Sequence, residues 1–176
     1  MAQHSLIVFS HLDWDLVYQR PQHLLTALSE NRRVYYVEEP DFSTGEPPHW
    51  RISQSLPNLW VCRPVLPQPS RAFGDRQMPL LRPLVRQLRR EVGLGEHAVW
   101  FYTPMAVPLL DSLEPSAVVY DCMDELSAFR HAPPELLQRE AELFRRADLV
   151  FTGGPSLYRA KKGQHPHVYC FPSAVD

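Results

Sequence analysis

The sequence lacks the features that would place it among membrane, secreted or metal-binding proteins. No apolar run approaches the roughly 20 residues that a membrane-spanning helix needs. The first residues, MAQHSLIVFSHLDWD, contain neither a basic region nor a small-residue cleavage site, so we expect no signal peptide. The motifs CxxC and HExxH are absent, and Cys and His do not cluster at ligand spacing, so we expect no metal site.

Cysteine is scarce and its pattern is not that of a disulfide framework. The residues Cys62, Cys122 and Cys170 are odd in number, widely spaced and set in apolar segments. Such cysteines are typical of free, buried thiols in a reducing compartment. We therefore expect a cytoplasmic protein.

The length and the net charge narrow the number of domains and the class of ligand to expect. A chain of 176 residues with 44% hydrophobic and 22% charged residues suits one well-buried globular domain. The net charge of -2 argues against a general nucleic-acid-binding surface, while leaving room for a local basic patch. Internal repeats and low-complexity tracts are absent.

Apolar runs and helical patterns alternate along the chain. A strand over 5–10, a helix from Pro21 to about Asn31 and a strand over 33–38 form an opening βαβ unit, whose first loop lacks the dinucleotide fingerprint GxGxxG. Further strands are expected at 97–102, 117–120, 149–151 and 167–171, a hairpin at 50–63, and helices at 76–92, 105–113, 134–147 and about 156–162. This order predicts an α/β fold of the Rossmann-like, doubly wound type, with a mainly parallel sheet and helices on both faces.

The helix expected over 134–147 has the clearest amphipathic pattern. Leu137, Ala141 and Phe144 recur at helical spacing and form its predicted apolar stripe, with Leu136 and Leu143 alongside. Glu135 and Arg139 are four residues apart, so we expect them to pair on the exposed face.

The stretch SAVVYDCMDELSAF, residues 116–129, combines a buried strand with a sudden run of polar residues. Its apolar part has no alternation, which is typical of a strand covered on both faces. Open α/β sheets bind ligands outside the carboxyl ends of their strands. We therefore predict that Asp121 contacts the substrate as a catalytic residue. Asp124 is a second binding candidate, with capping of the following turn as its favoured alternative.

Two more loops at expected strand ends contain candidate binding residues. In the first, His11 and Asp13 are predicted to bind a polar ligand, and Trp14 either stacks on it or packs against the sheet edge. Arg20, before Pro21, suits a phosphate at a helix N-terminus, or else a surface ion pair. In the second loop, 152–156, glycines allow close approach of backbone N–H groups to a ligand, so we predict that Gly153, Gly154 and Ser156 bind the substrate. The alternative for Ser156 is that it is the N-cap of the following helix.

The helix expected over 76–92 contains leucines at helical spacing with arginines between them. A basic amphipathic helix is suited to an anionic lipid surface, which makes Arg82, Arg86 and Arg89 candidates for membrane contact. The alternative, which we favour, is a solvated helix whose leucines face the sheet.

Five segments occur in an order that resembles a known family. SHLDWDLVYQRPQHLL, VYYVEEP, VVYDCMDELSAF, FTGGPSLYRAK and HVYCFPSAVD together resemble the N-terminal, acceptor-side half of GT-B glycosyltransferases of the retaining "family 4" type. The most similar subgroup is associated with bacterial cell-surface polysaccharide, including enzymes of the teichuronic-acid type. The resemblance covers nearly the whole chain. It departs from the family at Asp121, where relatives often have a histidine or another polar residue.

The resemblance implies an enzyme of two domains, one for the acceptor and one for the donor. Residues 1–171 would form the Rossmann-like acceptor domain, and 172–176 would begin a linker to a donor-binding domain that this chain lacks. The whole enzyme would move a sugar from an NDP-sugar to a polysaccharide or lipid-linked acceptor, without metal or cofactor and without nucleic acid as a partner. It would work in the cytoplasm, either free or peripherally at the inner face of the membrane, and this fragment would be inactive alone. The alternative is a non-catalytic Rossmann-like domain that binds a ligand or another protein.

Overall fold

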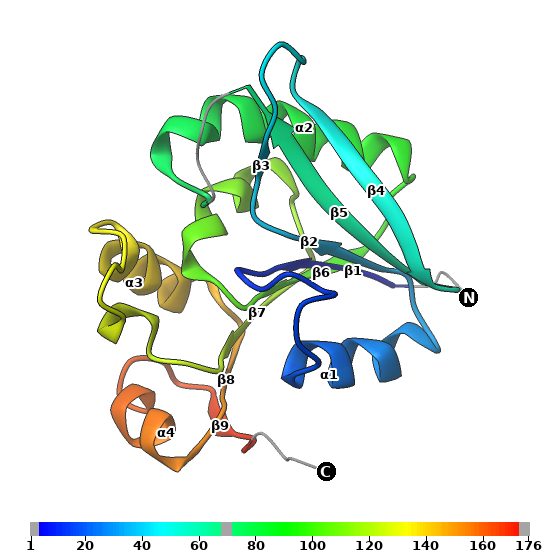
Figure 1. The fold of residues 1–176 in the computed structure, drawn as a ribbon. Coiled ribbons are helices and arrows are strands. Elements are labelled where there is room, and N and C mark those ends of the chain that lie inside the picture. The colour runs from blue at the N-terminus through cyan, green and yellow to red at the C-terminus, as the bar shows by residue number, and fades with distance from the viewer. Residues whose placement is uncertain (1–3, 68–71, 173–176) are drawn as a thin grey trace.

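The computed structural model describes residues 4–67 and 72–172, which form an α/β fold around one twisted sheet (Figure 1). The strand order is β3-β5-β2-β1-β6-β7-β8-β9, with β4 added beside β5. All pairs in it are parallel except β4 and β5. The strands are β1 (Ser5–Phe9), β2 (Val34–Val37), β3 (Asp41–Phe42), β4 (His49–Leu56), β5 (Leu59–Leu66), β6 (His97–Phe101), β7 (Ala117–Cys122), β8 (Leu149–Thr152) and β9 (Val168–Cys170).

Helices cover both faces of the sheet, as the sequence predicts (Figure 1). One face packs against α1 (Arg20–Ser29), and the other against α2 (Met78–Glu91), the 3-10 helix η2 (Pro104–Ser112) and α3 (Leu136–Arg146). Shorter elements complete the chain: η1 (Asp75–Gln77), η3 (Leu126–Ala128) and α4 (Pro155–Lys161). The Rossmann-like fold class is therefore confirmed.

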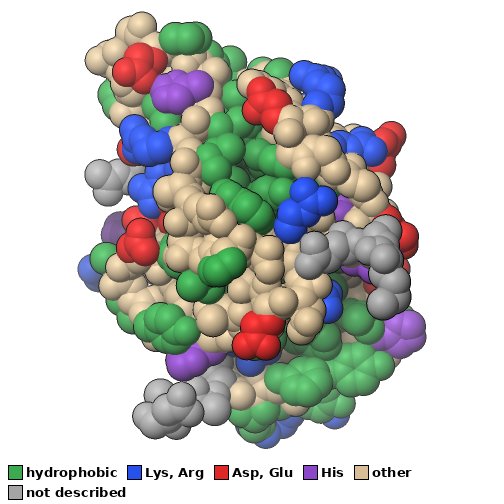
Figure 2. All heavy atoms as spheres, turned by 90° about the vertical axis from the view of Figure 1, so that its right-hand side faces the viewer, with side chains coloured by type: hydrophobic (Ala, Val, Ile, Leu, Met, Phe, Trp, Pro, Cys, Tyr) green, Lys and Arg blue, Asp and Glu red, His purple; other side chains and the backbone are tan. Residues whose placement is uncertain are grey.

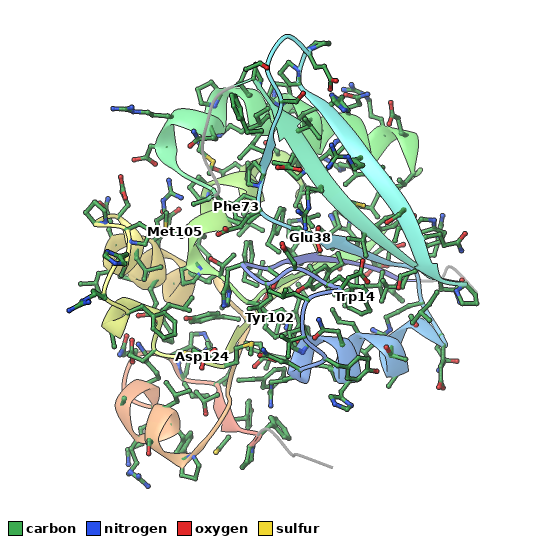
Figure 3. All side chains as sticks on the ribbon, in the orientation of Figure 1. Trp14, Glu38, Phe73, Tyr102, Met105 and Asp124 are labelled. Atoms are coloured by element: carbon green, nitrogen blue, oxygen red, sulfur yellow. The ribbon has the colours of Figure 1, made fainter. Side chains whose placement is uncertain are left out.

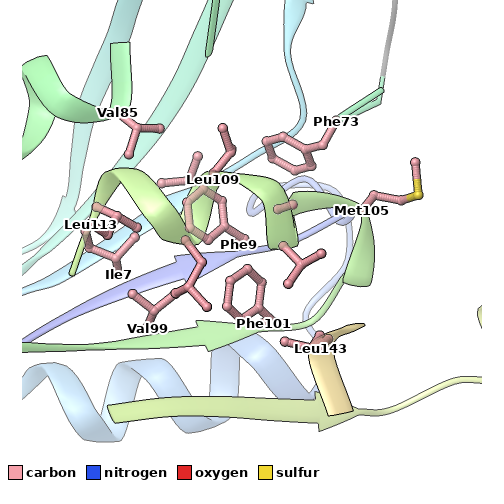
Figure 4. Close-up of a cluster of buried hydrophobic side chains, with 14 of the residues drawn as sticks. Ile7, Phe9, Phe73, Val85, Val99, Phe101, Met105, Leu109, Leu113 and Leu143 are labelled. Carbon is pink, nitrogen blue, oxygen red and sulfur yellow. The ribbon is translucent and has the colours of Figure 1, made fainter. Parts of the chain in front are cut away.

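The apolar core is divided by the sheet into two clusters. In β1, Leu6 and Val8 point toward α1, while Ile7 and Phe9 point toward α2 and η2. Phe9 stacks on Phe101 at a centroid distance of 5.4 Å and meets Phe73 edge-on at 5.8 Å (Figure 4). Strands covered on both faces need apolar residues at consecutive positions, which explains why these runs lack alternation.

Most predicted elements are present, and several differ in extent or type. The segment expected to be a short helix over 105–113 is a 3-10 helix, η2, in which Pro108 lies inside the element. The strand expected to end at Tyr120 continues to Cys122, so Asp121 belongs to β7 and pairs with Phe151 of β8. The predicted linker lies mostly outside the described residues.

The predicted apolar face of α3 is confirmed in part, because Leu136, Leu143 and Phe144 are buried while Ala141 is exposed. Leu137 is 63% exposed, whereas the charged residues Arg139 and Glu140 are buried beside Leu143 and Phe144. Arg139 turns inward because it donates to the carbonyl of Phe73, at 2.5 Å, to the carbonyl of Met105 and to Asp75. The predicted surface pair with Glu135 is replaced by these contacts.

No helix in the described ranges combines the length and the apolar character that crossing a bilayer requires.

Candidate functional site

The candidate site lies along the carboxyl edge, the edge of the sheet at which β1, β2, β6 and β7 end. Backbone hydrogen bonds continue past these ends, from Ser10 to Val37, from Glu38 to Cys62 and from Tyr102 to Phe9. The strand order changes direction between β1 and β6, because β2 lies on one side of β1 and the later strands on the other. Doubly wound sheets bind ligands at such a switch point.

Arg20 and Asp121 form a buried ion pair behind this edge. Arg20 Nε donates to both carboxylate oxygens of Asp121, at 3.1 and 3.0 Å, and the Asp121 side chain is completely buried. Burial raises the pKa of Asp121, and the hydrogen bonds and charge of Arg20 oppose that rise. A second nitrogen of Arg20 donates to the carbonyl of Phe171 at 2.5 Å. The pair thereby connects α1, β7 and the chain after β9.

This burial bears on the predicted catalytic role of Asp121. The carboxylate is covered by Arg20, and the side chains of Trp100 and Tyr102 face it closely enough to oppose the rise in its pKa. What the geometry supports is a positioning contact with Arg20. Direct contact between Asp121 and a substrate stays a prediction.

Trp14 anchors the loop after β1. The Trp14 backbone N–H donates to Glu38 at 2.6 Å, the indole Nε1 donates to Ser55 at 2.9 Å, and the ring meets Tyr36 edge-on. Only 7% of Trp14 is exposed, and Figure 3 shows it on the α1 side of the sheet. A buried ring offers no open face to a sugar, so the packing alternative describes Trp14 in this structure.

Arg63 joins two acidic residues of this region. Arg63 Nε donates to Glu38 at 2.6 Å, and a terminal nitrogen of Arg63 forms ion pairs with Glu38 at 2.5 Å and with Asp13 at 2.8 Å. Glu38 is buried, while about half of the Asp13 side chain is exposed. Asp13 is therefore held in place with part of its carboxylate open to a ligand.

Two cavities adjoin at His11 and Glu39, which line both of them. The polar compartment, about 350 Å³, is lined by His11, Asp13, Glu39, Asp41 and Arg63 among others. The apolar compartment, about 270 Å³, is lined by His11, Glu39, Thr103, Met105, Leu126, Phe129 and Leu136 among others. Each opens to the surface of the carboxyl edge, and together they match the size of small-molecule pockets, roughly 300–1,000 Å³.

Burial shifts both shared residues toward their neutral forms. The pKa of Glu39 is raised to about 8 by burial, with a smaller contribution from Asp13. Burial lowers the pKa of His11, which Asp124 and the Tyr102 backbone oppose. His11 Nδ1 is buried and has no hydrogen-bond partner within the described ranges. A neutral carboxyl group can both donate and accept a hydrogen bond, which suits a hydroxyl ligand.

Asp124 lies at the same edge but does not cap the following turn. The residue at the N-cap of η3 is Glu125, and its side chain makes no capping hydrogen bond. The capping role favoured for Asp124 is therefore wrong. Asp124 is exposed and close enough to His11 to influence its pKa.

The glycine loop has a packing role. A Cβ atom on Gly153 would lie 2.9 Å from the carbonyl oxygen of Met123, so the loop after β7 requires glycine here. Gly154 has open space around it and is the N-cap of α4, in place of Ser156, which is exposed. Ligand binding by these three residues stays a prediction.

The three arginine candidates lie on α2, whose Leu81, Leu84, Val85 and Leu88 are buried. Arg82 and Arg86 are exposed, and Arg89 pairs with Glu114 at 2.6 Å. Arg86 and Arg89 also line a surface hollow of about 420 Å³. On the face shown in Figure 2, positive side chains lie apart with acidic ones among them. Membrane contact stays a prediction.

Sequence reasoning did not select Glu39 or Arg63. A signal for Glu39 was present in VYYVEEP, because this apolar strand ends in two glutamates at the carboxyl edge. Arg63 comes from the antiparallel hairpin, and its position over the loop after β1 depends on the packing of β5 beside β2.

By sequence, the chain matches no protein-family model and no curated protein. By structure, it is similar to Escherichia coli trehalose-phosphate synthase bound with UDP-2-fluoro glucose, with a TM-score of 0.61 and 12% identity over 98% of this chain and 49% of that one. It is also similar to sucrose-phosphate synthase from Thermosynechococcus elongatus, with a TM-score of 0.60 and 10% identity over 98% of this chain and 91% of that one. A third similar structure is Anabaena HepE in complex with UDP and glucose, with a TM-score of 0.56 and 16% identity over 98% of this chain and 45% of that one.

The chain shares the Rossmann-like fold that is found in these GT-B glycosyltransferases. The chain spans about half the length of the E. coli and Anabaena proteins. At these identities the likeness shows the fold alone, and function depends on the residues of the site.

Proposed function

We propose that this chain is the acceptor-side domain of a retaining glycosyltransferase that moves a sugar from an NDP-sugar to a saccharide acceptor. The observation that carries this proposal is the polar compartment at the carboxyl edge, in a fold shared with proteins solved with UDP-2-fluoro glucose or with UDP and glucose. Its carboxylates and arginine are the groups that bind the hydroxyls of a sugar.

In this proposal, each residue of the edge has one role. Asp13, Glu39 and His11 contact hydroxyl groups of the acceptor, and Arg63 keeps Asp13 in place. Asp121 holds Arg20, whose cationic group lies at the start of α1. The diphosphate of the donor is held mainly by a second domain, and neither metal nor cofactor takes part.

The proposed acceptor is a polysaccharide or lipid-linked sugar of the bacterial cell surface, as in teichuronic-acid-type pathways. The enzyme would act in the cytoplasm, where Arg82, Arg86 and Arg89 contact anionic lipid at the inner face of the membrane. The surface hollow lined by Arg86 and Arg89 supports this contact.

The test is acceptor-dependent release of nucleoside diphosphate by the natural polypeptide that carries this sequence. NDP-sugars are assayed with hexosides, oligosaccharides and lipid-linked sugars as acceptors, beside the 176-residue chain. We expect release by the natural polypeptide and none by the 176-residue chain. Inactivity of the natural polypeptide across the donor panel would contradict the proposal and favour a non-catalytic ligand-binding domain.

A further inference from the structure

The two compartments differ in chemistry but share a wall. His11 and Glu39 line both, so a ligand that fills the polar compartment reaches the apolar one by passing these two side chains. On one side of them lie Asp13, Asp41 and Arg63. On the other lie the side chains of Met105, Leu126 and Phe129.

The polar compartment is built to accept hydroxyl groups. Arg63 is fixed by a hydrogen bond and an ion pair to the buried Glu38 and by its ion pair with Asp13, so its direction is set before a ligand arrives. Arg51 likewise donates to Asp41 at 2.9 Å. A preorganised set of carboxylates loses little conformational entropy when hydroxyl groups bind to it.

The wall of the apolar compartment consists mainly of apolar side chains, and Thr103, Arg130 and His131 are its polar members besides the two shared residues. It lies where residues 126–136 cross the start of η2, and Figure 3 shows Met105 on this side of the sheet. Phe129 remains 57% exposed. Covering such a side chain with an apolar ligand group is favourable, because it removes apolar surface from water.

The shared residues fit the junction between a sugar and an apolar substituent. Burial raises the pKa of Glu39 to about 8, so this carboxyl is mainly neutral at pH 7. A neutral carboxyl can donate a hydrogen bond to a glycosidic or hydroxyl oxygen without bringing a charge beside the apolar compartment. His11 lines both compartments and therefore lies at the same junction.

We propose that the site binds an amphiphilic glycoside, with its sugar in the polar compartment and an apolar aglycone in the apolar compartment. This inference rests on the proposed acceptor function and narrows it: the acceptor carries an alkyl, prenyl or aryl group on its sugar. His11 and Glu39 contact the junction of the two parts, and Phe129 covers the aglycone.

The experiment measures the affinity of this chain for glucosides, galactosides and mannosides, each as the methyl, butyl and p-nitrophenyl glycoside, by titration calorimetry. For at least one sugar, the butyl or p-nitrophenyl form is expected to bind at least tenfold more tightly than the methyl form. Preference for butyl indicates a lipid-like aglycone, and preference for p-nitrophenyl an aromatic one. In Phe129→Ser the preference falls below threefold, while affinity for the methyl glycoside is unchanged.

Leu137→Ser is the matched control, since Leu137 is similarly exposed, at 63%, but lies outside the apolar compartment. It is expected to keep the full preference. If methyl glycosides bind and the larger aglycones add nothing, or if Phe129→Ser keeps the preference, this inference is wrong while the acceptor function stands. If no glycoside of the panel binds, the inference is also wrong, and the transfer assay decides the proposed function separately.

Discussion

Arg20 and Asp121 lie 101 positions apart in the sequence, yet Nε of Arg20 is 3.0 Å from a carboxylate that is fully buried. The pair joins the first helix to the central strand β7, and through Phe171 it reaches the chain after β9. It therefore fixes three segments that meet at the carboxyl edge.

Replacing Arg20 with methionine should leave Asp121 buried without its counter-charge. Breaking one side of a buried pair costs about 3–5 kcal/mol. The loss should be larger at pH 8 than at pH 5, because the raised pKa of Asp121 lets the folded variant take up a proton at the lower pH. Urea unfolding at both pH values measures this difference.

The double variant R20M/D121N is the control for that experiment. An uncharged amide needs no counter-charge, so we expect the double variant to recover part of the lost stability and to lose the pH dependence. Equal stability of R20M and the wild-type chain at pH 8 would show that the pair does not hold the edge together.

Lys161 should contribute strongly to stability although it lies near the end of a short helix. Its Nζ is 2.9 Å from Glu140 and 3.0 Å from Glu125, and Glu140 also accepts a hydrogen bond from Tyr120. Lys161→Met should lower the free energy of unfolding by about 3 kcal/mol. The exposed neighbour Lys162→Met should change it by less than about 0.5 kcal/mol. Similar effects of the two substitutions would contradict the role of this network.

Gly153 and Gly154 should respond differently to the same substitution. A methyl group on Gly153 meets the Met123 backbone at 2.9 Å, whereas a methyl group on Gly154 meets no atom within 4 Å. We expect Gly153→Ala to lose about 1–3 kcal/mol of stability and Gly154→Ala to lose little. Thermal unfolding of the two variants measures the difference, and a tolerated Gly153→Ala would show that the loop after β7 shifts easily.

Glu39 should make stability decrease as pH rises. Its pKa of about 8 in the folded chain exceeds the ordinary value of 4.5, so the folded state binds more protons between these values and loses stability through that range. The fall in stability between pH 4.5 and pH 8 should therefore be smaller in Glu39→Gln than in the wild-type chain, by about 4 kcal/mol. Other titratable or charged residues line the same compartments and face Glu39 there: His11, Asp13, Asp41, Arg63, Arg130 and His131.

Glu46→Gln is the control for Glu39, since Glu46 is exposed and lies outside both compartments. It should leave the difference in stability between pH 4.5 and pH 8 unchanged. If Glu39→Gln also left this difference in stability unchanged, Glu39 would be ionised in the folded chain at neutral pH. Its side chain would then not be a hydrogen-bond donor at the junction.

The buried strands could be predicted because their cause is local. Val34 to Val37 are consecutive apolar residues, and a strand covered on both faces requires such a run. The end of β7 could not be predicted in this way. A carboxylate usually marks the end of a buried strand, but Arg20 supplies a counter-charge from a distant part of the chain, so the strand continues through Asp121.

The buried face of α3 and the arrangement of the site also depend on residues that are distant in the sequence. Arg139 and Glu140 are polar in any local pattern, and only their distant partners make burial favourable. Three site candidates, His11, Asp13 and Asp124, do lie at the carboxyl edge, because strand ends can be read from the sequence. The two compartments that have His11 and Glu39 in common depend on side-chain packing between loops, which no local sequence pattern predicts.

The central claim is that the carboxyl edge holds a sugar acceptor. Its most direct test is a nuclear magnetic resonance titration of the isotope-labelled chain with the glycoside panel. We predict that amide signals shift at residues 11–13, 39–41 and 103–105, and that those of the opposite edge, such as 96–98, do not. Shifts confined to the opposite edge, or no shifts with any glycoside at millimolar concentration, would contradict the account.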